Sequence, residues 1–463
     1  MKPKKPTKLF GTDGIRAKAG EFPLDSATVH IAGASLAQHL AEQNGSRLPR
    51  IIVGRDTRES GRQIERDLMG GARAIGAEIE SAGIITTPGV AFLTSALNAD
   101  AGVVISASHN PYQDNGIKIF DPSGRKLDNL TEEKIEADIV AGRFKNNTPA
   151  IEITLDDTTR QSELRSRYLD HLQRDVASDL SLDGLKLVID CANGAASELA
   201  PDLFGRLGAK VMAINNHPDG RNINLNCGSL HIEGLKQRVV IERASLGVAF
   251  DGDADRALFV DAQGEFVDGD AAIWVLANYL KSRGELDHQL VVSTVMTNLG
   301  LEVALESAGI KLTRTDVGDK FVLDELLRTK AVLGGEQSGH IIFPKISLAG
   351  DGMLTAIKVL RVMRDRDKSL NELVEGFSRY PQILLNIPVC EKIPFANIPA
   401  IERKTREIKA SLGDRGRLLL RYSGTEALAR VMIEGENEKQ VYSLADELAE
   451  IIRTEIGKTE IAG

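Results

Sequence analysis

The chain has 463 residues, of which 42% are hydrophobic and 27% charged, and its formal net charge at neutral pH is −9. This composition is ordinary for a globular protein, and the length predicts about three or four domains. A net negative charge disfavours nucleic acid as a partner, because phosphate backbones are bound by basic surfaces. No apolar run has the length of a membrane span, so we expect no membrane partner.

The first residues, Met1–Lys8, are basic but lead into Leu9–Asp13 rather than into the apolar stretch of a secretory signal. The three cysteines, Cys191, Cys227 and Cys390, are widely spaced and odd in number. This pattern argues against a disulfide framework and against a structural zinc site. Together these features are typical of a cytoplasmic enzyme.

Short apolar strands alternate with helical patterns along most of the chain, as is typical of α/β layers. Three segments share one design, an apolar strand that ends in a polar turn and leads into a helix. They are Ile51–Arg58, Leu187–Gly194 and Leu290–Asn298. We interpret this weak internal repeat as three related α/β domains in series.

The segment Ala101–Pro111 is an apolar strand that runs into a loop of turn-forming residues, which predicts that Ser108 lies near the strand's carboxyl end. Ligands of open α/β sheets bind at that end. A serine needs activation or prior modification to react, and no Gly-x-Ser-x-Gly elbow of a hydrolase is present. We therefore favour phosphorylation of Ser108. The neighbouring His109, taken alone, is more simply a hydrogen-bonding loop residue.

The most informative segment is Asp251–Asp255, three carboxylates at alternate positions, followed by Arg256. Carboxylates this close repel one another, and all-oxygen ligands suit Mg²⁺. A calcium EF-hand does not fit, because its turn-glycine position is Arg256 and its bidentate glutamate position is Ala262. The flanks, Leu246–Phe250 and Ala257–Val260, read as strands. We predict a metal-holding turn between two strands, with an acidic surface turn as the alternative.

Two later segments carry polar groups suited to a phosphorylated sugar. Gly334–His340 combines glycines, which let the backbone approach a ligand, with Glu, Gln and Ser side chains that can bind hydroxyls. Arg421–Glu426, together with Arg430, supplies two guanidinium groups, two hydroxyls and turn amides that can clamp a phosphate. Taken alone, each segment is also explained as an ordinary turn or hairpin.

The end of the chain has a different pattern, which predicts a smaller α+β domain. Strands expected at Gly416–Arg421 and Ala429–Glu434 pair and precede an amphipathic helix. The apolar face of that helix consists of Val441, Leu444, Leu448, Ile451, Ile452 and Ile456. We predict four domains: residues 1–157 with the Ser108 loop, 158–262 with the acidic turn, 263–379 with Gly334–His340, and 380–463 with the phosphate clamp.

In their order along the chain, these four segments resemble the active-site loops of the α-D-phosphohexomutases, and the resemblance covers nearly the whole sequence. The loops are the family's phosphoserine loop around Ser108, its metal loop at Asp251–Arg256, its sugar-recognition loop at Gly335–His340 and its phosphate-binding loop at Arg421–Arg430. The resemblance implies three similar α/β domains with mixed sheets around a central cleft, plus a smaller C-terminal α+β domain.

Within the family, the chain resembles most the branch that interconverts glucosamine 6-phosphate and glucosamine 1-phosphate, feeding UDP-N-acetylglucosamine and cell-wall synthesis. The residues that carry this narrower resemblance are Phe10–Arg16, Asn222–Ser229 with His231, and Gln337. Relatives that act on glucose or mannose phosphates usually have Met or Glu at the last position. A phosphoglucomutase or phosphomannomutase of the same fold is the alternative. Three positions depart from the family's pattern without removing a reactive group: Ala17, Leu230 and Ala427.

The resemblance implies a phosphotransfer within one sugar. Phosphorylated Ser108 would donate its phosphoryl group to the free hydroxyl, and the resulting sugar bisphosphate would turn over and return its other phosphate to Ser108. The implied ligands of one Mg²⁺ are Ser108, Asp251, Asp253 and Asp255. The implied catalytic residues are Arg16, Lys118 and Arg256, which neutralise phosphoryl charge, and Lys118, His109 and His340, which are candidates for proton transfer.

The implied substrate contacts come from the last two loops: Glu336, Gln337, Ser338, Arg421, Ser423, Gly424, Thr425 and Arg430. The implied ligands are a small phosphosugar and a sugar bisphosphate that serves as intermediate and activator. Whether that bisphosphate or an activating kinase first phosphorylates Ser108 stays open, as does homodimer formation.

Two alternative functions belong to other classes of protein. A sugar-phosphate sensor would not need all four loops, and a hydrolase acting through Ser108 would release phosphate.

Overall fold

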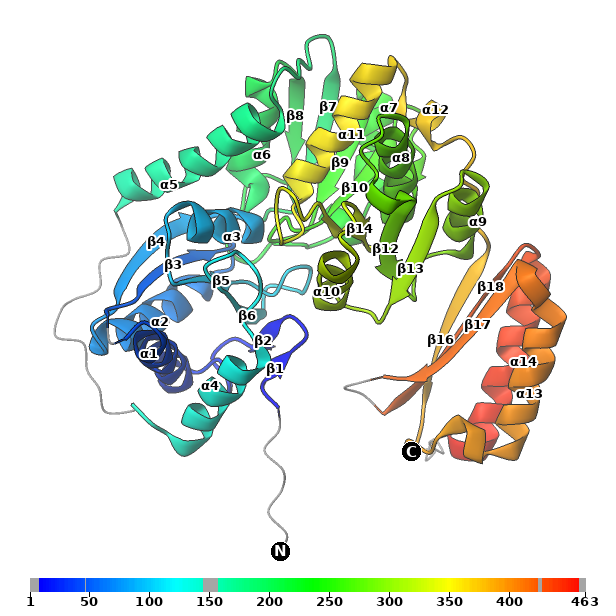
Figure 1. Ribbon diagram of the computed structural model, residues 1–463, viewed down its shortest axis with the longest axis horizontal. Coiled ribbons are helices and arrows are strands. Elements are labelled where there is room, and N and C mark those ends of the chain that lie inside the picture. Colours follow the sequence, from blue (N-terminus) through cyan, green and yellow to red (C-terminus); the bar gives the residue numbers. More distant parts are fainter. Residues whose placement is uncertain (1–7, 46, 145–156, 424–426, 458–463) are drawn as a thin grey trace, which may run out of the picture. The chain divides into compact units, whose positions relative to one another are not determined.

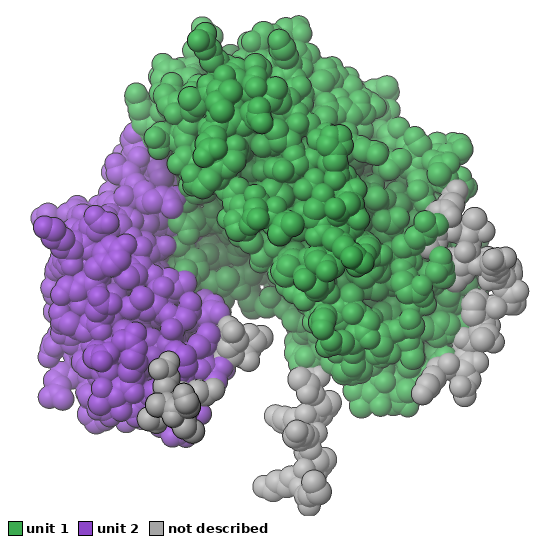
Figure 2. Space-filling view, turned by 180° about the vertical axis from the view of Figure 1, so that it is seen from behind, with its two compact units in different colours: residues 1–296, 310–375 green, residues 297–309, 376–463 purple. Residues whose placement is uncertain are grey.

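The computed structural model describes residues 8–45, 47–144, 157–423 and 427–457. Among these residues, no helix combines the length and the apolar character needed to cross a membrane. The chain divides into two compact units, which Figure 2 distinguishes by colour. The first unit comprises residues 1–296 and 310–375, and the second comprises residues 297–309 and 376–463.

The first sheet of the first unit, blue to cyan in Figure 1, has the strand order β1-β2-β6-β5-β3-β4. Its strands are β1 Phe10–Gly11, β2 Gly14–Lys18, β3 Arg50–Arg55, β4 Glu78–Ile84, β5 Ala101–Ile105 and β6 Asp114–Phe120. The associated helices are α1 Ser26–Gln43, α2 Gly61–Ala74, α3 Thr87–Ala96 and α4 Asn129–Ala141. One core joins this sheet to α1, α2 and α4. We refer to these elements as the first module.

The second module has the strand order β11-β10-β9-β7-β8. Its strands are β7 Lys186–Asp190, β8 Lys210–Ile214, β9 Leu246–Phe250, β10 Ala257–Asp261 and β11 Phe266–Val267, and its helices are α5 Thr158–His171, α6 Ala196–Arg206 and α7 Glu233–Glu242. Short helical turns follow α5 at Leu172–Val176 and precede α7 at Gly228–Leu230.

The third module has the strand order β13-β12-β14-β15. Its strands are β12 Leu290–Thr294, β13 Lys311–Thr315, β14 Gly334–Gly335 and β15 Ile341–Ile342. Its helices are α8 Gly269–Ser282, α10 Asp319–Thr329, α11 Gly352–Arg366 and α12 Leu370–Val374, with a helical turn at Asp287–Gln289. Helix α9, Leu299–Ser307, belongs to the second unit.

The three modules share one strand plan. In each, a central strand (β3, β7 or β12) pairs in parallel with two neighbours, and the second neighbour pairs with an antiparallel strand. These central strands are the three repeated segments of the sequence, so the predicted series of related α/β domains with mixed sheets is confirmed. The turn before each antiparallel strand is the one that holds Ser108, Asp251–Arg256 or Glu336–His340.

The second unit contains the antiparallel sheet β16-β18-β17, formed by Gln382–Pro388, Leu428–Gly435 and Gly416–Tyr422. Helices α13 Pro399–Leu412 and α14 Glu438–Ile456 share its apolar core, and helical turns lie at Phe395–Asn397 and Gly413–Arg415. The predicted strand pair and amphipathic helix are confirmed. Strand β16, which begins directly after Pro381, was not predicted from the sequence.

Helices α1 and α2 pack so closely that their contact requires glycine. A Cβ atom built on Gly71 would lie 1.9 Å from the carbonyl oxygen of His30. We expect Gly71→Ala to lower the free energy of unfolding by about 1–3 kcal/mol, since helix backbones cannot yield without local repacking. Thermal and denaturant unfolding measure this change. Gly205→Ala, in helix α6 where a Cβ meets nothing within 4 Å, is the matched control. It should be neutral or stabilising, and an equal loss in both variants would contradict the packing argument.

Candidate active site

The acidic turn lies between the antiparallel strands β9 and β10, as predicted. Asp251, Asp253 and Asp255 are all buried, and one carboxylate oxygen from each lies within 4.8 Å of the others. The Oδ1 atoms of Asp253 and Asp255 are buried and have no hydrogen-bond partner among the residues that the structure describes. Because buried carboxylate oxygens require a partner, this all-oxygen donor set fits a hard divalent cation.

Cationic side chains surround this turn and set its electrostatics. Burial, followed by the charges of Asp255 and Asp253, raises the pKa of Asp251 well above its ordinary value. Burial also acts to raise the pKa of Asp255, but Lys118, His340 and Arg256 outweigh it and hold that pKa well below its ordinary value. The turn therefore concentrates negative charge that its neighbours must balance.

Ser108 lies in the loop between β5 and β6, where it is buried and has a left-handed backbone conformation with φ of 52°. Its Oγ donates a hydrogen bond to Oδ2 of Asp251 at 2.6 Å. The Nδ1 atom of His109 lies 3.2 Å from the same Oγ. The structure thus brings together a serine and an aspartate that are 143 positions apart in the chain.

Lys118, on β6, joins the acidic turn to Asp13, between β1 and β2, through its ammonium group. Its Nζ lies 2.8 Å from Oδ2 of Asp253, 3.4 Å from Oδ2 of Asp255 and 3.1 Å from Oδ2 of Asp13. Burial acts to lower the pKa of Lys118, but these three carboxylates raise it well above its ordinary value. Lys118 is therefore a charged ammonium in this arrangement.

His109 and Arg256 are in direct contact beside Ser108. Nη1 of Arg256 lies 3.2 Å from Nδ1 of His109. Burial, then the charges of Arg256 and Arg16, lowers the pKa of His109 to about 4, so its imidazole is neutral at pH 7. Arg16 itself pairs with Asp13.

The sugar-recognition loop reaches the acidic turn through His340. Its Nδ1 lies 3.6 Å from Oδ1 of Asp255, and its Nε2 lies 3.8 Å from Oδ2 of Asp319. Burial acts to lower the pKa of His340, but Asp255, Asp319 and Glu336 raise it to about 9. Glu336 accepts hydrogen bonds from the amide of Gly318 at 3.1 Å and from the hydroxyl of Ser338 at 3.3 Å. The backbone carbonyl of Gln337 accepts from Gly269.

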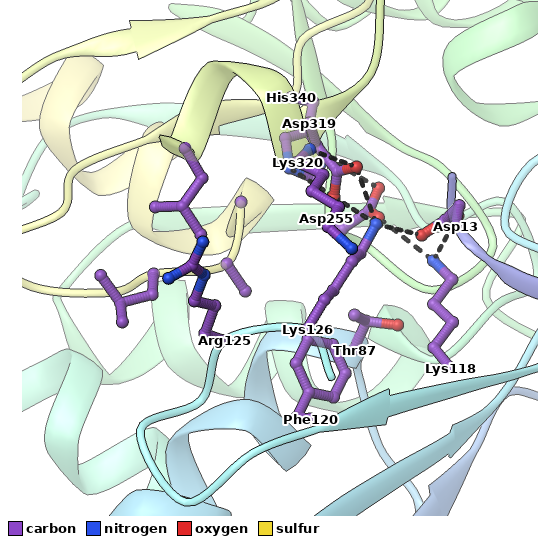
Figure 3. Close-up of a pocket in the computed structure, with 14 residues that line it drawn as sticks. Asp13, Thr87, Lys118, Phe120, Arg125, Lys126, Asp255, Asp319, Lys320 and His340 are labelled. Carbon is purple, nitrogen blue, oxygen red and sulfur yellow. Dashed lines mark hydrogen bonds and ion pairs between the residues drawn. The ribbon is translucent and has the colours of Figure 1, made fainter. Parts of the chain in front are cut away.

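A pocket beside this cluster, shown in Figure 3, contains charged residues that the sequence analysis did not assign. Lys126 lies between two carboxylates, with Nζ 2.5 Å from Oδ1 of Asp13 and 2.5 Å from Oδ2 of Asp319. Asp13 was within the segment Phe10–Arg16, which the sequence singled out. Nothing in the local sequence around Lys126 or Asp319 indicates a role at the site, because these two residues come together only where the first and third modules meet.

The phosphate clamp lies in the second unit. Arg421 on β17 is directly opposite Arg430 on β18, and Nη2 of Arg430 lies 3.4 Å from the hydroxyl of Ser423. Lys392, which the sequence analysis did not consider, donates a hydrogen bond to the carbonyl of Ser423 at 2.6 Å. The clamp thus gathers three cationic side chains. Gly424 and Thr425 lie outside the described residues.

The order of the modules and loops along the chain matches the order of domains in a known family. Phosphoglucomutase/phosphomannomutase alpha/beta/alpha domains I, II and III match residues 7–146, 166–264 and 268–380, and the C-terminal domain matches residues 384–451. The chain belongs to the phosphoglucomutase/phosphomannomutase family. It is therefore a mutase, an enzyme of the isomerase class, and the family resemblance inferred from the four loops is confirmed.

Relatives of similar length share a more specific name. A phosphoglucosamine mutase of Solibacter usitatus is 49% identical over 97% of this chain and 99% of its own length. One from Chlamydia muridarum is 43% identical over 98% of both chains. The solved structure of a phosphoglucomutase/phosphomannomutase family protein from Burkholderia thailandensis matches with a TM-score of 0.79 at 23% identity, covering 96% of this chain and 97% of that one. It supports the fold.

Proposed function

We propose that this mutase interconverts glucosamine 6-phosphate and glucosamine 1-phosphate through a phosphoserine at Ser108 and a sugar bisphosphate. The observation that carries the proposal is the 2.6 Å hydrogen bond from Ser108 to Asp251, in an acidic turn that Lys118 and Arg256 contact. A hydroxyl that faces buried carboxylates and cations is suited to phosphoryl transfer, in which positioning and charge stabilisation do most of the work. The relatives named phosphoglucosamine mutase support the amino-sugar substrate.

The acidic turn is proposed to hold one Mg²⁺, with Ser108 completing the ligands of Asp251, Asp253 and Asp255. The Oδ1 atoms of Asp253 and Asp255, which accept no hydrogen bond among the described residues, support this assignment, as does the hard oxygen donor set. When bound, the ion would supply Lewis-acid chemistry that withdraws charge from a phosphoryl group.

The surrounding cations are proposed to stabilise the transferring phosphoryl group. Lys118 and Arg256 already lie against the acidic turn, and Arg16 is close enough to influence the pKa of His109. Fixed charges in a buried site stabilise developing negative charge without reorganising. His109, His340 and Lys118 are the candidates for moving a proton. Of these, His109 contacts the Ser108 hydroxyl directly.

Sugar recognition is proposed to involve Glu336, Gln337 and Ser338. The distal phosphate is assigned to the clamp of Arg421, Ser423, Gly424, Thr425 and Arg430, with Lys392 as an added cation. A sugar bisphosphate is proposed as intermediate and activator. Whether that bisphosphate or an activating kinase first phosphorylates Ser108 stays open, as does homodimer formation. A cytoplasmic location belongs to the proposal, as does the domain division 1–157, 158–262, 263–379 and 380–463.

Ser108→Ala should reduce turnover by at least about a thousandfold, because the group that carries the phosphate is lost. Circular dichroism and calorimetric titration with glucosamine 1-phosphate should show that the fold and substrate binding persist. Intact-mass analysis with peptide mapping, after incubation with a hexose 1,6-bisphosphate, should place one phosphoryl group on the wild-type Ser108 peptide. Ser123→Ala, at an exposed serine, is the control and should be phosphorylated normally. Near-normal turnover in Ser108→Ala would refute the phosphoserine mechanism.

Asp253→Asn should weaken Mg²⁺ binding by at least about tenfold, since one formal charge and one hard ligand are removed. Isothermal titration with Mg²⁺ or Mn²⁺ measures this loss independently of activity. Asp67→Asn, at a partly exposed aspartate on α2, controls for net charge and should bind metal as the wild type does. Undiminished turnover after exhaustive chelation would show that no metal is required.

The substrate assignment is tested by comparing kcat/KM for glucosamine 1-phosphate, glucose 1-phosphate and mannose 1-phosphate. We expect the wild type to prefer the amino sugar. Glu336→Ala should impair all substrates together, because the hydroxyls it would bind are shared. Gln337→Met should shift the ratio of efficiencies toward glucose 1-phosphate, since a polar partner for the distinguishing group is lost. A wild-type preference for glucose or mannose phosphate would favour the alternative, a phosphoglucomutase or phosphomannomutase.

A further inference from the structure

The segment Asn222–Ser229 carried the family resemblance without an assigned chemical role, and the structure shows that it packs against the Ser108 loop. Within it, Asn224 is buried, with 9% of its surface exposed, and has a φ of 58°. Its backbone amide donates to the carbonyl of Ala192 at 2.9 Å. Its side-chain Nδ2 donates to the carbonyl oxygens of Ser108 at 2.9 Å and Asn110 at 3.0 Å.

Arg58 approaches the same two carbonyls from the first module. Its side chain is fully buried, and Nη2 donates to the carbonyl of Ser108 at 2.9 Å and to that of Asn110 at 2.8 Å. Nη1 donates to the carbonyl of Pro111. Asp56 fixes this guanidinium by accepting a hydrogen bond from Nε at 2.9 Å. Two carbonyls of the Ser108 loop are thus each bound by donors from two modules.

The loop needs this support because of its backbone conformation. Ser108 has a φ of 52°, in the left-handed region that non-glycine residues rarely adopt. Such a conformation persists where surrounding contacts over-determine it. A carbonyl oxygen can accept two hydrogen bonds, so Arg58 and Asn224 together can fill both positions on the carbonyl of Ser108. Fixing that peptide also fixes the direction in which the Ser108 side chain points.

The acidic turn packs directly against the carbonyl of Ser108 and the side-chain amide of Asn224. A Cβ atom built on Gly252 would lie 2.5 Å from the carbonyl oxygen of Ser108 and 3.0 Å from Nδ2 of Asn224. The two loops therefore meet at backbone distance, with the Asn224 amide beside them. A change in the orientation of the Ser108 peptide would move its hydroxyl relative to Asp251.

We propose that Asn224 and Arg58 are positioning residues for phosphoryl transfer, holding Ser108 in its left-handed conformation so that its Oγ faces the acidic turn. The inference rests on the proposed function, because it assumes that Ser108 carries the phosphate. It gives the Asn222–Ser229 segment a role in the transfer step. Neither residue touches the reacting atoms, so each acts through the backbone of the Ser108 loop.

The decisive variant is Asn224→Asp, which keeps the shape of the side chain but replaces the donor amide by a carboxylate facing two carbonyls. We expect kcat for glucosamine 1-phosphate to fall by roughly 10- to 100-fold, because a small misplacement of a reacting group has an effect of this size. KM should change by less than about threefold, since substrate contacts are intact. Single-turnover phosphorylation of Ser108 by a hexose 1,6-bisphosphate should slow by the same factor as kcat.

Three further variants separate positioning from folding. Asn224→Ala and Asn226→Ala both place alanine at a left-handed position, since the two residues have φ angles of 58° and 52°. Asn226, however, is exposed and makes no hydrogen bond to the Ser108 loop among the described residues. Asn226→Ala should keep the wild-type kcat. Arg58→Lys keeps the charge beside Asp56 but cannot present a planar fork to several carbonyls, so it should reproduce the loss in kcat.

The outcomes distinguish this inference from the proposed function. Wild-type protein that turns over no hexose phosphate would overturn the proposed function and this inference with it. An active wild type, with folded Asn224 variants that match it in kcat and in phosphorylation rate, would overturn the inference alone. So would a loss seen only in KM, or a loss of folded protein in both Asn224 variants, because each indicates a role other than positioning.

Discussion

The burial of three carboxylates in one short turn is the constraint on which the rest of the site depends. Asp251, Asp253 and Asp255 lie close enough to share one cation, and charges this close cannot remain buried without positive partners. The cationic side chains that balance these carboxylates come from separate parts of the chain: Lys118 from β6 and His340 from the third module. The need to balance the buried negative charge of this one turn thus explains why loops distant in sequence converge on it.

The repeated strand plan provides the geometry for this convergence. In each module the functional loop follows the last parallel strand and precedes its antiparallel neighbour. The carboxyl ends of parallel strands lie at one edge of a sheet, where ligands bind in open α/β folds. Three copies of this arrangement therefore offer three loops at equivalent places, which differ in length and in the side chains that their sequences supply.

Close backbone contacts then join the loops, both within the second module and between the first and second modules. A Cβ atom on Gly194 would lie 2.3 Å from the carbonyl oxygen of Gly252, and one on Gly252 would lie 2.5 Å from that of Ser108. Glycine is needed at both positions because no side chain fits between the turns. The hydroxyl of Thr87 adds a hydrogen bond to Oδ2 of Asp253 at 2.6 Å. The position of the serine is thus set by packing between modules.

The sequence by itself determined the features that depend on local pattern. Apolar runs that end in polar turns identified β3, β7 and β12, and the spacing of Asp251, Asp253 and Asp255 identified an acidic turn that could hold a metal ion. Only the tertiary structure decided which distant groups meet. Lys126 and Asp319 are 193 positions apart, and Asn224 and Ser108 are 116 apart. Nothing in the local sequence marks Lys126 or Asp319, and no local pattern pairs Asn224 with Ser108, because these contacts form only when the chain folds.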